Sequence, residues 1–227
     1  MPTYRVAEAN IDLAVFDVVG EDGNIATFIK HVGLAMSTGK HSADGVPVVD
    51  MAPPLHGQDE YGRMKADVVG NAVLTDDDRR KIATFVDRHA GEHEAFRQLG
   101  GLELLSTFPR IYIVYPHMKP FHEEDGRYAR MRFSCAGFVL EAYKRARIRL
   151  LDPEALPRVE MDAIRPCYPQ LVGHVERGRI SLEDLGLEGD GPWPVLLCGY
   201  LFHALNRDSA AVRSKPYTPN IEDRCFG

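Results

Sequence analysis

The sequence predicts an α+β fold in which an antiparallel sheet or small barrel packs against a helix. Two later segments, residues 75–100 and 133–151, repeat their apolar residues at helical spacing. Three earlier segments have strand composition, and successive strands joined by a short loop normally pair antiparallel. These segments are residues 11–19, 25–36 and 46–51.

Turn residues separate the predicted strands. The stretch GEDGN at 20–24 lies between the first two, and STGKHSADG at 37–45 forms a polar loop before the third. The third strand, VPVVDM, is β-branched and ends at Pro53 and Pro54. Its antiparallel return brings Asp50 back towards His31, which lies in the second strand.

The first helical segment carries its own start and stop signals. Thr75 is a suitable N-cap residue with the acidic Asp78 three positions later, and the pair Gly100-Gly101 marks the end. The apolar positions of this helix fall near a period of 3.6 residues. They are Ile82, Phe85, Val86, Ala90 and Phe96.

The rest of the chain gives weaker local signals. We expect a short helix at 102–107, a strand at 110–116, a surface loop at 116–127, and either a strand or a buried helix in the apolar segment 192–205. The length suits one domain over residues 1–227. Within it, residues of about 56–125 form a helical insertion or connection and about 152–227 a C-terminal extension.

Composition bears on partners and location. A formal charge of −6 without a long basic run argues against nucleic acid, because phosphate binding needs clustered Lys and Arg. The first twenty residues have neither the basic start nor the long apolar stretch of a targeting signal. No run approaches the roughly 18 apolar residues of a membrane helix. We therefore expect a soluble, cytoplasmic protein without an integral membrane segment.

The four cysteines do not form the close pairs of a structural zinc site. They are widely spaced, and with no secretion signal they are better interpreted as reduced thiols than as a disulfide framework. Histidines and carboxylates show no compact ligand spacing either, so we expect no metal site. The cysteines are Cys135, Cys167, Cys198 and Cys225.

Cys135 occupies a chemically favourable position. Ser134 is a good N-cap, so Cys135 falls in the first turn of the helix predicted at 133–151. The free N–H groups and the dipole at a helix start favour thiolate over thiol and can also stabilise an oxyanion. A nearby imidazole would complete a nucleophilic pair. The structural alternative is a small apolar side chain packed in a buried helix.

Two motifs resemble those of NlpC-type cysteine peptidases. The segment SCAGFVLEAYKRARIRLL, from Ser134, is similar to the nucleophile helix of that family, and HVGLAMSTGKHSADGVPVVDMAPP, from His31, is similar to its histidine hairpin. Here the hairpin precedes the helix. This inverted order resembles the circularly permuted papain-like branch, which includes relatives of lecithin–retinol acyltransferase.

The resemblance implies a permuted papain-like fold and assigns three roles. Cys135 is implied as nucleophile, His31 as general base and Asp50 as the group that orients the imidazole. The similarity covers about residues 25–55 and 130–150. The sequence departs from the family at Ser134 and Ala136, where an acidic residue and a serine are frequent, and at Asp50, where His, Asn or Gln is more common.

Other residues compete for roles at the site. His117 and His122 are nearer to Cys135 in sequence than His31 is, although they lie in the expected surface loop. Tyr128 and Ser134 are candidate substrate-binding residues. The arginines 127, 130 and 132 would favour an anionic substrate or the thiolate, or else they form a solvated charged arm.

The expected activity is hydrolysis of an amide or peptide bond through a cysteine acyl-enzyme, without cofactor or metal. The substrate would be a small-molecule, peptidyl or acyl amide or ester. Two alternatives stay open: a lipid-directed acyltransferase or thioesterase with the same pair, and a non-catalytic binding module of the same fold. The sequence leaves the oligomeric state open.

Overall fold

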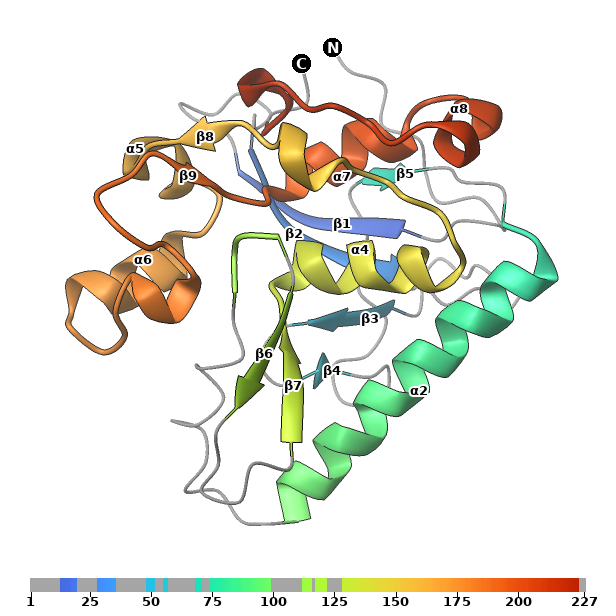
Figure 1. The fold of residues 1–227 in the computed structure, drawn as a ribbon, viewed down its shortest axis with the longest axis horizontal. Coiled ribbons are helices and arrows are strands. Elements are labelled where there is room, and N and C mark those ends of the chain that lie inside the picture. Colours follow the sequence, from blue (N-terminus) through green and yellow to red (C-terminus); the bar gives the residue numbers. More distant parts are fainter. Residues whose placement is uncertain are drawn as a thin grey trace.

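A computed structural model describes residues 13–19, 28–35, 48–51, 55–56, 68–70, 74–98, 112–115, 117–121 and 128–224. Its main sheet is antiparallel, with the strand order β4-β3-β2-β1-β5. Figure 1 shows this sheet behind helix α4. The strands are β1 (Leu13–Val19), β2 (Phe28–Ala35), β3 (Val48–Met51), β4 (Leu55–His56) and β5 (Val68–Gly70).

Strand β2 lies at the centre of the sheet and is shielded on both faces. Ile29 and Val32 are fully buried, and Leu34 nearly so. A strand with one solvent-exposed face would bury only every second residue. Ile29 and Val32 point to opposite faces and both are buried, so both faces of β2 are covered. His31 pairs with Phe16 of β1, and Gly33 pairs with Asp50 of β3.

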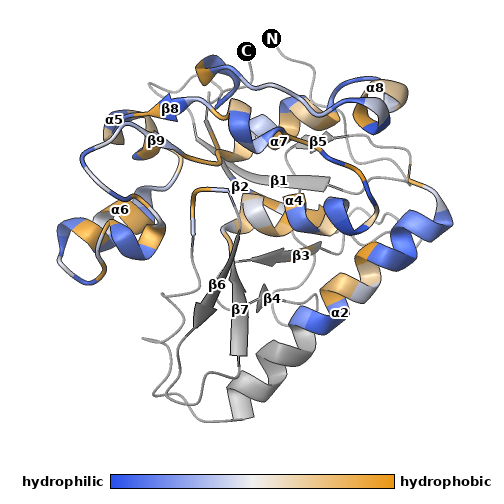
Figure 2. Ribbon diagram, in the orientation of Figure 1, coloured by the Kyte–Doolittle hydropathy of each residue, from blue (hydrophilic) through white to orange (hydrophobic). Residues whose placement is uncertain are grey.

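Helices α4 (Cys135–Arg145) and α7 (Cys198–Leu205) both contact β2 and also contact each other. Figure 2 shows apolar residues in both helices. Every residue from Phe133 to Tyr143 is buried. The two helices bring together segments that lie far apart in the chain.

Helix α4 is more deeply buried than its sequence pattern predicts. Glu141 lies on the polar side of the helix in sequence, but it is 2% exposed, and Lys144 Nζ donates to its carboxylate at 2.9 Å. The ammonium group of Lys144 stays exposed and supplies the counter-charge that a buried carboxylate needs. The last turn of α4 also contains Arg145. The positive charges of Lys144 and Arg145 therefore lie at the negative end of the helix dipole, where they stabilise the helix.

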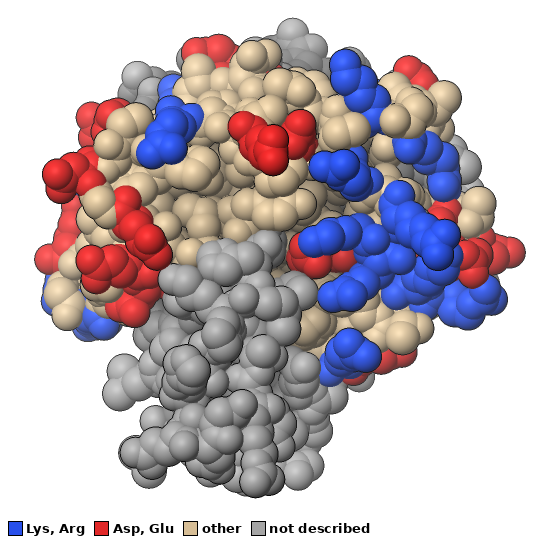
Figure 3. Space-filling view, viewed as in Figure 1, with Lys and Arg blue, Asp and Glu red and all other residues tan. Residues whose placement is uncertain are grey.

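Positive charge gathers on one side of the molecule although the chain as a whole is acidic. Figure 3 shows Lys and Arg side chains over the end of α4 and the first half of α2 (Asp76–Gln98). Both Lys144 and Arg145 are exposed there. The start of α4, where Cys135 lies, is at the opposite end of that helix.

Helix α2 (Asp76–Gln98) packs against α4 with the apolar face that its sequence predicts. Ile82, Phe85 and Val86 are buried, and the Phe85 ring lies 5.5 Å from that of Phe138. The capping prediction is also confirmed. The amide of Asp78 donates to Thr75 Oγ1 at 3.2 Å while the amide of Thr75 donates to Asp78 Oδ2 at 2.8 Å.

The last third of the chain belongs to the same core. One cluster of buried apolar side chains includes Ile29 of β2, Phe138 of α4, Leu201 of α7 and Val212 of α8 (Ser209–Ser214). The region expected as a C-terminal extension therefore supplies part of the packing around the main sheet. Likewise β5, within the region expected as a helical connection, pairs with β1 and forms one edge of that sheet.

The remaining elements are short. Two further ladders pair β6 (His117–Phe121) with β7 (Tyr128–Arg132), and β8 (Arg158–Val159) with β9 (Trp193–Pro194). The other helices are η2 (Pro153–Ala155), α5 (Met161–Ile164), α6 (Pro169–Glu176), η3 (Glu183–Leu185), α8 (Ser209–Ser214) and η4 (Ile221–Arg224).

The strands predicted for the main sheet are confirmed, whereas two segments after α2 differ from their predicted structure. The three early strands and the antiparallel pairing are confirmed, as is the end of α2 at Gln98. The loop expected at 116–127 is wrong in its first part, because β6 occupies residues 117–121. Of the strand expected at 110–116 the structure describes residues 112–115, and these form one isolated bridge, between Val114 and Val195. The helix expected at 102–107 lies outside the described residues.

None of the helices within the described residues is both long enough and apolar enough to span a lipid bilayer.

Candidate active site

Cys135 is the first residue of α4, as predicted, and Ser134 caps the helix. The Ser134 hydroxyl accepts from the Gly137 amide at 3.2 Å, and the Ser134 carbonyl accepts from the Phe138 amide at 2.8 Å. The N–H groups of Cys135 and Ala136 have no partner within the helix, since the first turn of an α-helix has none to offer them. The Cys135 thiol thus lies where free N–H groups and the helix dipole favour negative charge.

His31 comes to this thiol from the central strand β2. Its side chain is half-buried, and the imidazole is close enough to hydrogen-bond the Cys135 sulfur. The backbone N–H of Val32 also donates to that sulfur. The two residues that the sequence assigned to a nucleophilic pair are therefore neighbours, one from the sheet and one from the helix packed on it.

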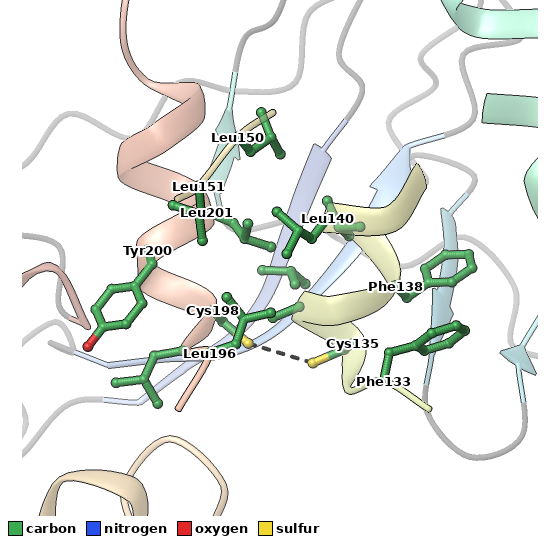
Figure 4. Packing of buried hydrophobic residues seen from close by; sticks show 14 of the residues in the cluster. Phe133, Cys135, Phe138, Leu140, Leu150, Leu151, Leu196, Cys198, Tyr200 and Leu201 are labelled. Atoms are coloured by element: carbon green, nitrogen blue, oxygen red, sulfur yellow. Dashed lines mark hydrogen bonds between the residues drawn. The ribbon is translucent and has the colours of Figure 1, made fainter. Parts of the chain in front are cut away.

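A second thiol, which sequence analysis left among the ordinary cysteines, completes the group. Cys198 is the first residue of α7, and its Sγ lies 3.6 Å from that of Cys135 (Figure 4). Cys198 is fully buried, whereas Cys135 is 6% exposed. Because α4 and α7 start side by side on the sheet, two helix N-termini direct their partial positive charge at one pair of sulfur atoms.

The pKa values of the two thiols are shifted in opposite directions. The pKa of Cys135 is held well below its ordinary value, first by a hydrogen bond from Cys198 and then by the charge and hydrogen bond of His31 and the amide of Val32, which together outweigh burial. The pKa of Cys198 is raised well above its ordinary value, because its proton is shared with Cys135 and because burial penalises a second negative charge. Cys135 is thus the more acidic thiol of the pair.

Tyr168, which sequence analysis did not select, holds the surrounding segments together. Its buried hydroxyl donates to the Leu196 carbonyl at 2.6 Å and lies 3.4 Å from the Ser134 hydroxyl. It therefore joins the start of α6, the chain just before α7 and the N-cap of α4. Burial and the neighbouring sulfur atoms raise the pKa of Tyr168 well above its ordinary value, so the phenol stays protonated.

Ser134, proposed from sequence as a substrate-binding residue, is 3% exposed. Its hydroxyl already serves the helix cap and contacts Tyr168. These contacts give Ser134 a positioning task at the site. A contact between Ser134 and a substrate stays a prediction.

Asp50 is placed by strand register. It pairs with Gly33, two residues along β2 from His31, so positions 31 and 50 are diagonal neighbours across an antiparallel pair. The hairpin predicted from sequence therefore exists. The side chain of Asp50 lies outside what the structure describes, and its orienting role stays a prediction.

Of the competing residues, the structure describes the backbone of His117 and Tyr128. His117 pairs with Arg132, and Tyr128 pairs with Phe121, at the two ends of the β6-β7 ladder. Their side chains, together with residues 122 and 127, are outside the described part of the chain. Within the described residues, no three His, Cys, Asp or Glu side chains are grouped so that they could hold a metal ion.

Comparison with protein-family models, with curated proteins and with solved structures gives no significant match to this chain. The chemistry of the site therefore has to be argued from its own residues. They are a thiol of lowered pKa, an adjacent imidazole and two N–H groups of the first helical turn that have no partner within the helix.

Proposed function

We propose that this protein is a thiol-dependent hydrolase that cleaves an amide or peptide bond through an acyl-enzyme on Cys135. The proposal includes a permuted papain-like arrangement in which the hairpin with His31 precedes the helix with Cys135. The single observation that carries it is the meeting of His31 with the Cys135 thiol at the start of α4. A structural cysteine has no need of an imidazole, a helix N-terminus and a lowered pKa together.

The chemistry follows from these three features. Cys135 Sγ attacks the substrate carbonyl, so a C–S bond forms and the carbonyl oxygen becomes an oxyanion. The free N–H groups of Cys135 and Ala136 are the available donors for that charge. His31 then gives its proton to the leaving amine as the C–N bond breaks, and a thioester is left on Cys135.

Water completes the cycle. His31, now neutral, removes a proton from water as it attacks the thioester, and the C–S bond breaks to return the Cys135 thiolate and a carboxylic acid. When Cys135 is the thiolate, in the resting enzyme and after each turnover, the neighbouring S–H of Cys198 can donate to its sulfur at 3.6 Å and support the charge. Donation to a charged acceptor is stronger than donation to a neutral one.

A test uses an activated acyl ester, such as an acetyl p-nitrophenyl ester, which needs no knowledge of the natural substrate. The parent should release one equivalent of p-nitrophenol in a rapid burst, and mass spectrometry should find the acyl group on the tryptic peptide 133–144, which contains Cys135. His31→Ala should slow this acylation by about 100-fold or more, the typical contribution of a general base.

Cys167→Ala is the matched control, because Cys167 is also a buried thiol but lies outside the pair. It should acylate at the parent rate. If the acyl group were found equally on all cysteine peptides, or if His31→Ala acylated Cys135 as fast as the parent, the proposed nucleophilic pair would be wrong.

A further inference from the structure

The closeness of Cys198 to Cys135 has no necessary part in amide hydrolysis. A papain-like mechanism needs one thiol, and an imidazole suffices to activate it. Yet the second sulfur lies 3.6 Å from the first, in the interior, at the start of a different helix. A disulfide bond has a sulfur–sulfur length of about 2 Å, so closure requires the two atoms to approach by roughly 1.5 Å.

We propose that Cys135 and Cys198 form a reversible modification site, at which a hydroperoxide oxidises Cys135 and Cys198 then closes an intramolecular disulfide that masks the nucleophile. The regulatory meaning rests on the proposed function, because masking matters only if Cys135 is the nucleophile. The disulfide itself rests on the geometry of the two thiols alone.

The first step is oxidation of Cys135. Its thiolate attacks one peroxide oxygen, an S–O bond forms and the O–O bond breaks. The sulfur loses two electrons and becomes a sulfenic acid, and the peroxide gains them and leaves as an alcohol, or as water from hydrogen peroxide, after taking a proton. Cys135 is the sulfur that is oxidised, because it is the more exposed of the two and is the thiol whose pKa is lowered.

The second step is resolution by Cys198. Its sulfur attacks the Cys135 sulfur, an S–S bond forms and the S–O bond breaks. The departing hydroxide takes the Cys198 proton and leaves as water. One hydroperoxide thus converts two thiols into a disulfide, an alcohol and water. A reducing dithiol reverses the change by thiol–disulfide exchange and restores Cys135.

Cys198 is better placed for this task than the other buried thiol that the structure describes. Cys167 is also buried, at 1% exposure, but the sulfur that lies 3.6 Å from Cys135 Sγ belongs to Cys198. The start of α7 is held by packing, since a side chain at Gly199 would meet the backbone of η4 at 2.2 Å. Cys198 is therefore kept beside Cys135 by the fold and does not need to be brought there.

The experiment treats the full chain with hydrogen peroxide and maps tryptic peptides without reduction. The four cysteines fall in four different tryptic peptides, so the cross-link can be assigned. The parent should lose two hydrogen atoms in mass and yield a linked peptide pair, 133–144 with 180–207. A dithiol should restore both the mass and the acylation burst.

Two variants sharpen the outcome. Cys198→Ala should accumulate two and three oxygen atoms on the Cys135 peptide, which a dithiol does not reverse, whereas Cys167→Ala should form the same linked pair as the parent. Stable over-oxidation of Cys135 in the parent, or a linked pair that involves Cys167, would overturn the inference. The two proposals fail separately. A disulfide without ester acylation would contradict the hydrolase and support the modification site. Ester acylation without the disulfide would support the hydrolase and contradict the modification site.

Discussion

At Cys135 a thiol from a helix start meets an imidazole from a strand, an amide from the same strand and a thiol from a second helix. Each neighbour acts on the sulfur within hydrogen-bonding distance, so small displacements of their elements would change its acidity. Tyr168 opposes such displacements. Its hydroxyl lies between Ser134, which precedes Cys135, and Leu196, which lies two residues before Cys198.

Tyr168→Phe tests this tether at the scale of one hydroxyl. The phenol is buried and donates to the Leu196 carbonyl at 2.6 Å, so its removal leaves a buried acceptor without its donor. We expect the free energy of unfolding to fall by about 1–3 kcal/mol, measured by urea denaturation.

Tyr217→Phe is the matched control for Tyr168→Phe. The Tyr217 hydroxyl donates to Asp223 Oδ2 at 2.8 Å, but both residues are half-buried and water can replace the lost bond. Tyr217→Phe should therefore lower the free energy of unfolding less than Tyr168→Phe does. Equal losses in the two variants would show that the buried hydroxyl of Tyr168 is not a tether.

Single residues differed in how far the sequence could identify them. Ser134 and Cys135 were predicted because an N-cap and a first-turn cysteine are local features of the chain. His31 was chosen through a family resemblance, since spacing could not select among the histidines. Cys198 and Tyr168 were missed, because their roles depend on contacts with residues 63 and 34 positions away, which leave no local pattern.

At the scale of elements, helix α7 is positioned by its second residue. A Cβ built on Gly199 would lie 2.2 Å from the Asp223 carbonyl oxygen and 2.7 Å from the Arg224 carbonyl carbon. Both atoms are backbone, so no side-chain rotation can relieve the clash. Only glycine allows η4 to pack this closely against the start of α7.

Gly199→Ala should therefore destabilise the protein by about 1–3 kcal/mol, as overpacking of a filled interior does. Thermal unfolding is the measurement. Gly173→Ala, in helix α6, is the control, because its Cβ would meet only the movable end of the Arg177 side chain at 3.2 Å. Alanine is also the better helix former there. Similar melting temperatures for the two variants would contradict the close packing of η4 on α7.

Elements with a strong local pattern were predicted well, and elements defined by distant partners were not. The apolar period of α2 and the turns between β1, β2 and β3 are local, and both predictions are confirmed. The segment at 110–116 has strand composition, but within its described residues, 112–115, the backbone partners of Ile113 lie in two separate segments. The Ile113 amide donates to the Leu185 carbonyl, while the Ile113 carbonyl accepts from the Leu196 amide. Residues 112–115 therefore form no regular ladder.

At the scale of the whole molecule, one ion pair joins helix α2 to helix α8. Arg213 Nη2 of α8 donates to Asp78 Oδ2 of α2 at 2.6 Å, across 135 positions of sequence. Burial alone would raise the pKa of Asp78, but Arg213 and the amide and hydroxyl of Thr75 outweigh it and lower the pKa to about 2. The carboxylate is therefore more acidic in the folded protein than in the unfolded chain.

This shift predicts how stability depends on pH. A carboxyl group whose pKa is lower in the folded protein stabilises that protein at any pH above its pKa in the unfolded chain, which is 3.8 here. This contribution is lost as the pH falls from 3.8 towards the folded pKa of about 2. The contribution amounts to about 2 kcal/mol. Asp78→Asn should lose it at neutral pH, so the parent and the variant should differ in unfolding free energy near pH 6 and converge near pH 2.

Asp77→Asn is the control for the ion pair, because Asp77 is exposed and pairs only within its own helix, with Arg80 and Lys81. Solvent screens such pairs, so its effect on stability should be small at every pH. A parent and an Asp78→Asn variant with parallel pH profiles would contradict the role given to the ion pair.

The assembly of the site belongs to the whole molecule and was predicted only in part. The sequence indicated the hairpin, the helix and their pairing as His31 with Cys135. It did not indicate that residues 152–224 would supply α7 and complete the pair of thiols. Contacts between such distant segments depend on how the elements pack, and periodicity describes each element alone.

The central claim is that His31 activates Cys135, and the pH dependence of Cys135 alkylation tests it most directly. The rate of iodoacetamide addition to the Cys135 peptide should reach half its maximum at a pH well below the ordinary thiol value of about 8.5. In His31→Ala the midpoint should move up towards that value. A parent midpoint near 8.5, or a midpoint that His31→Ala leaves unchanged, would contradict the account.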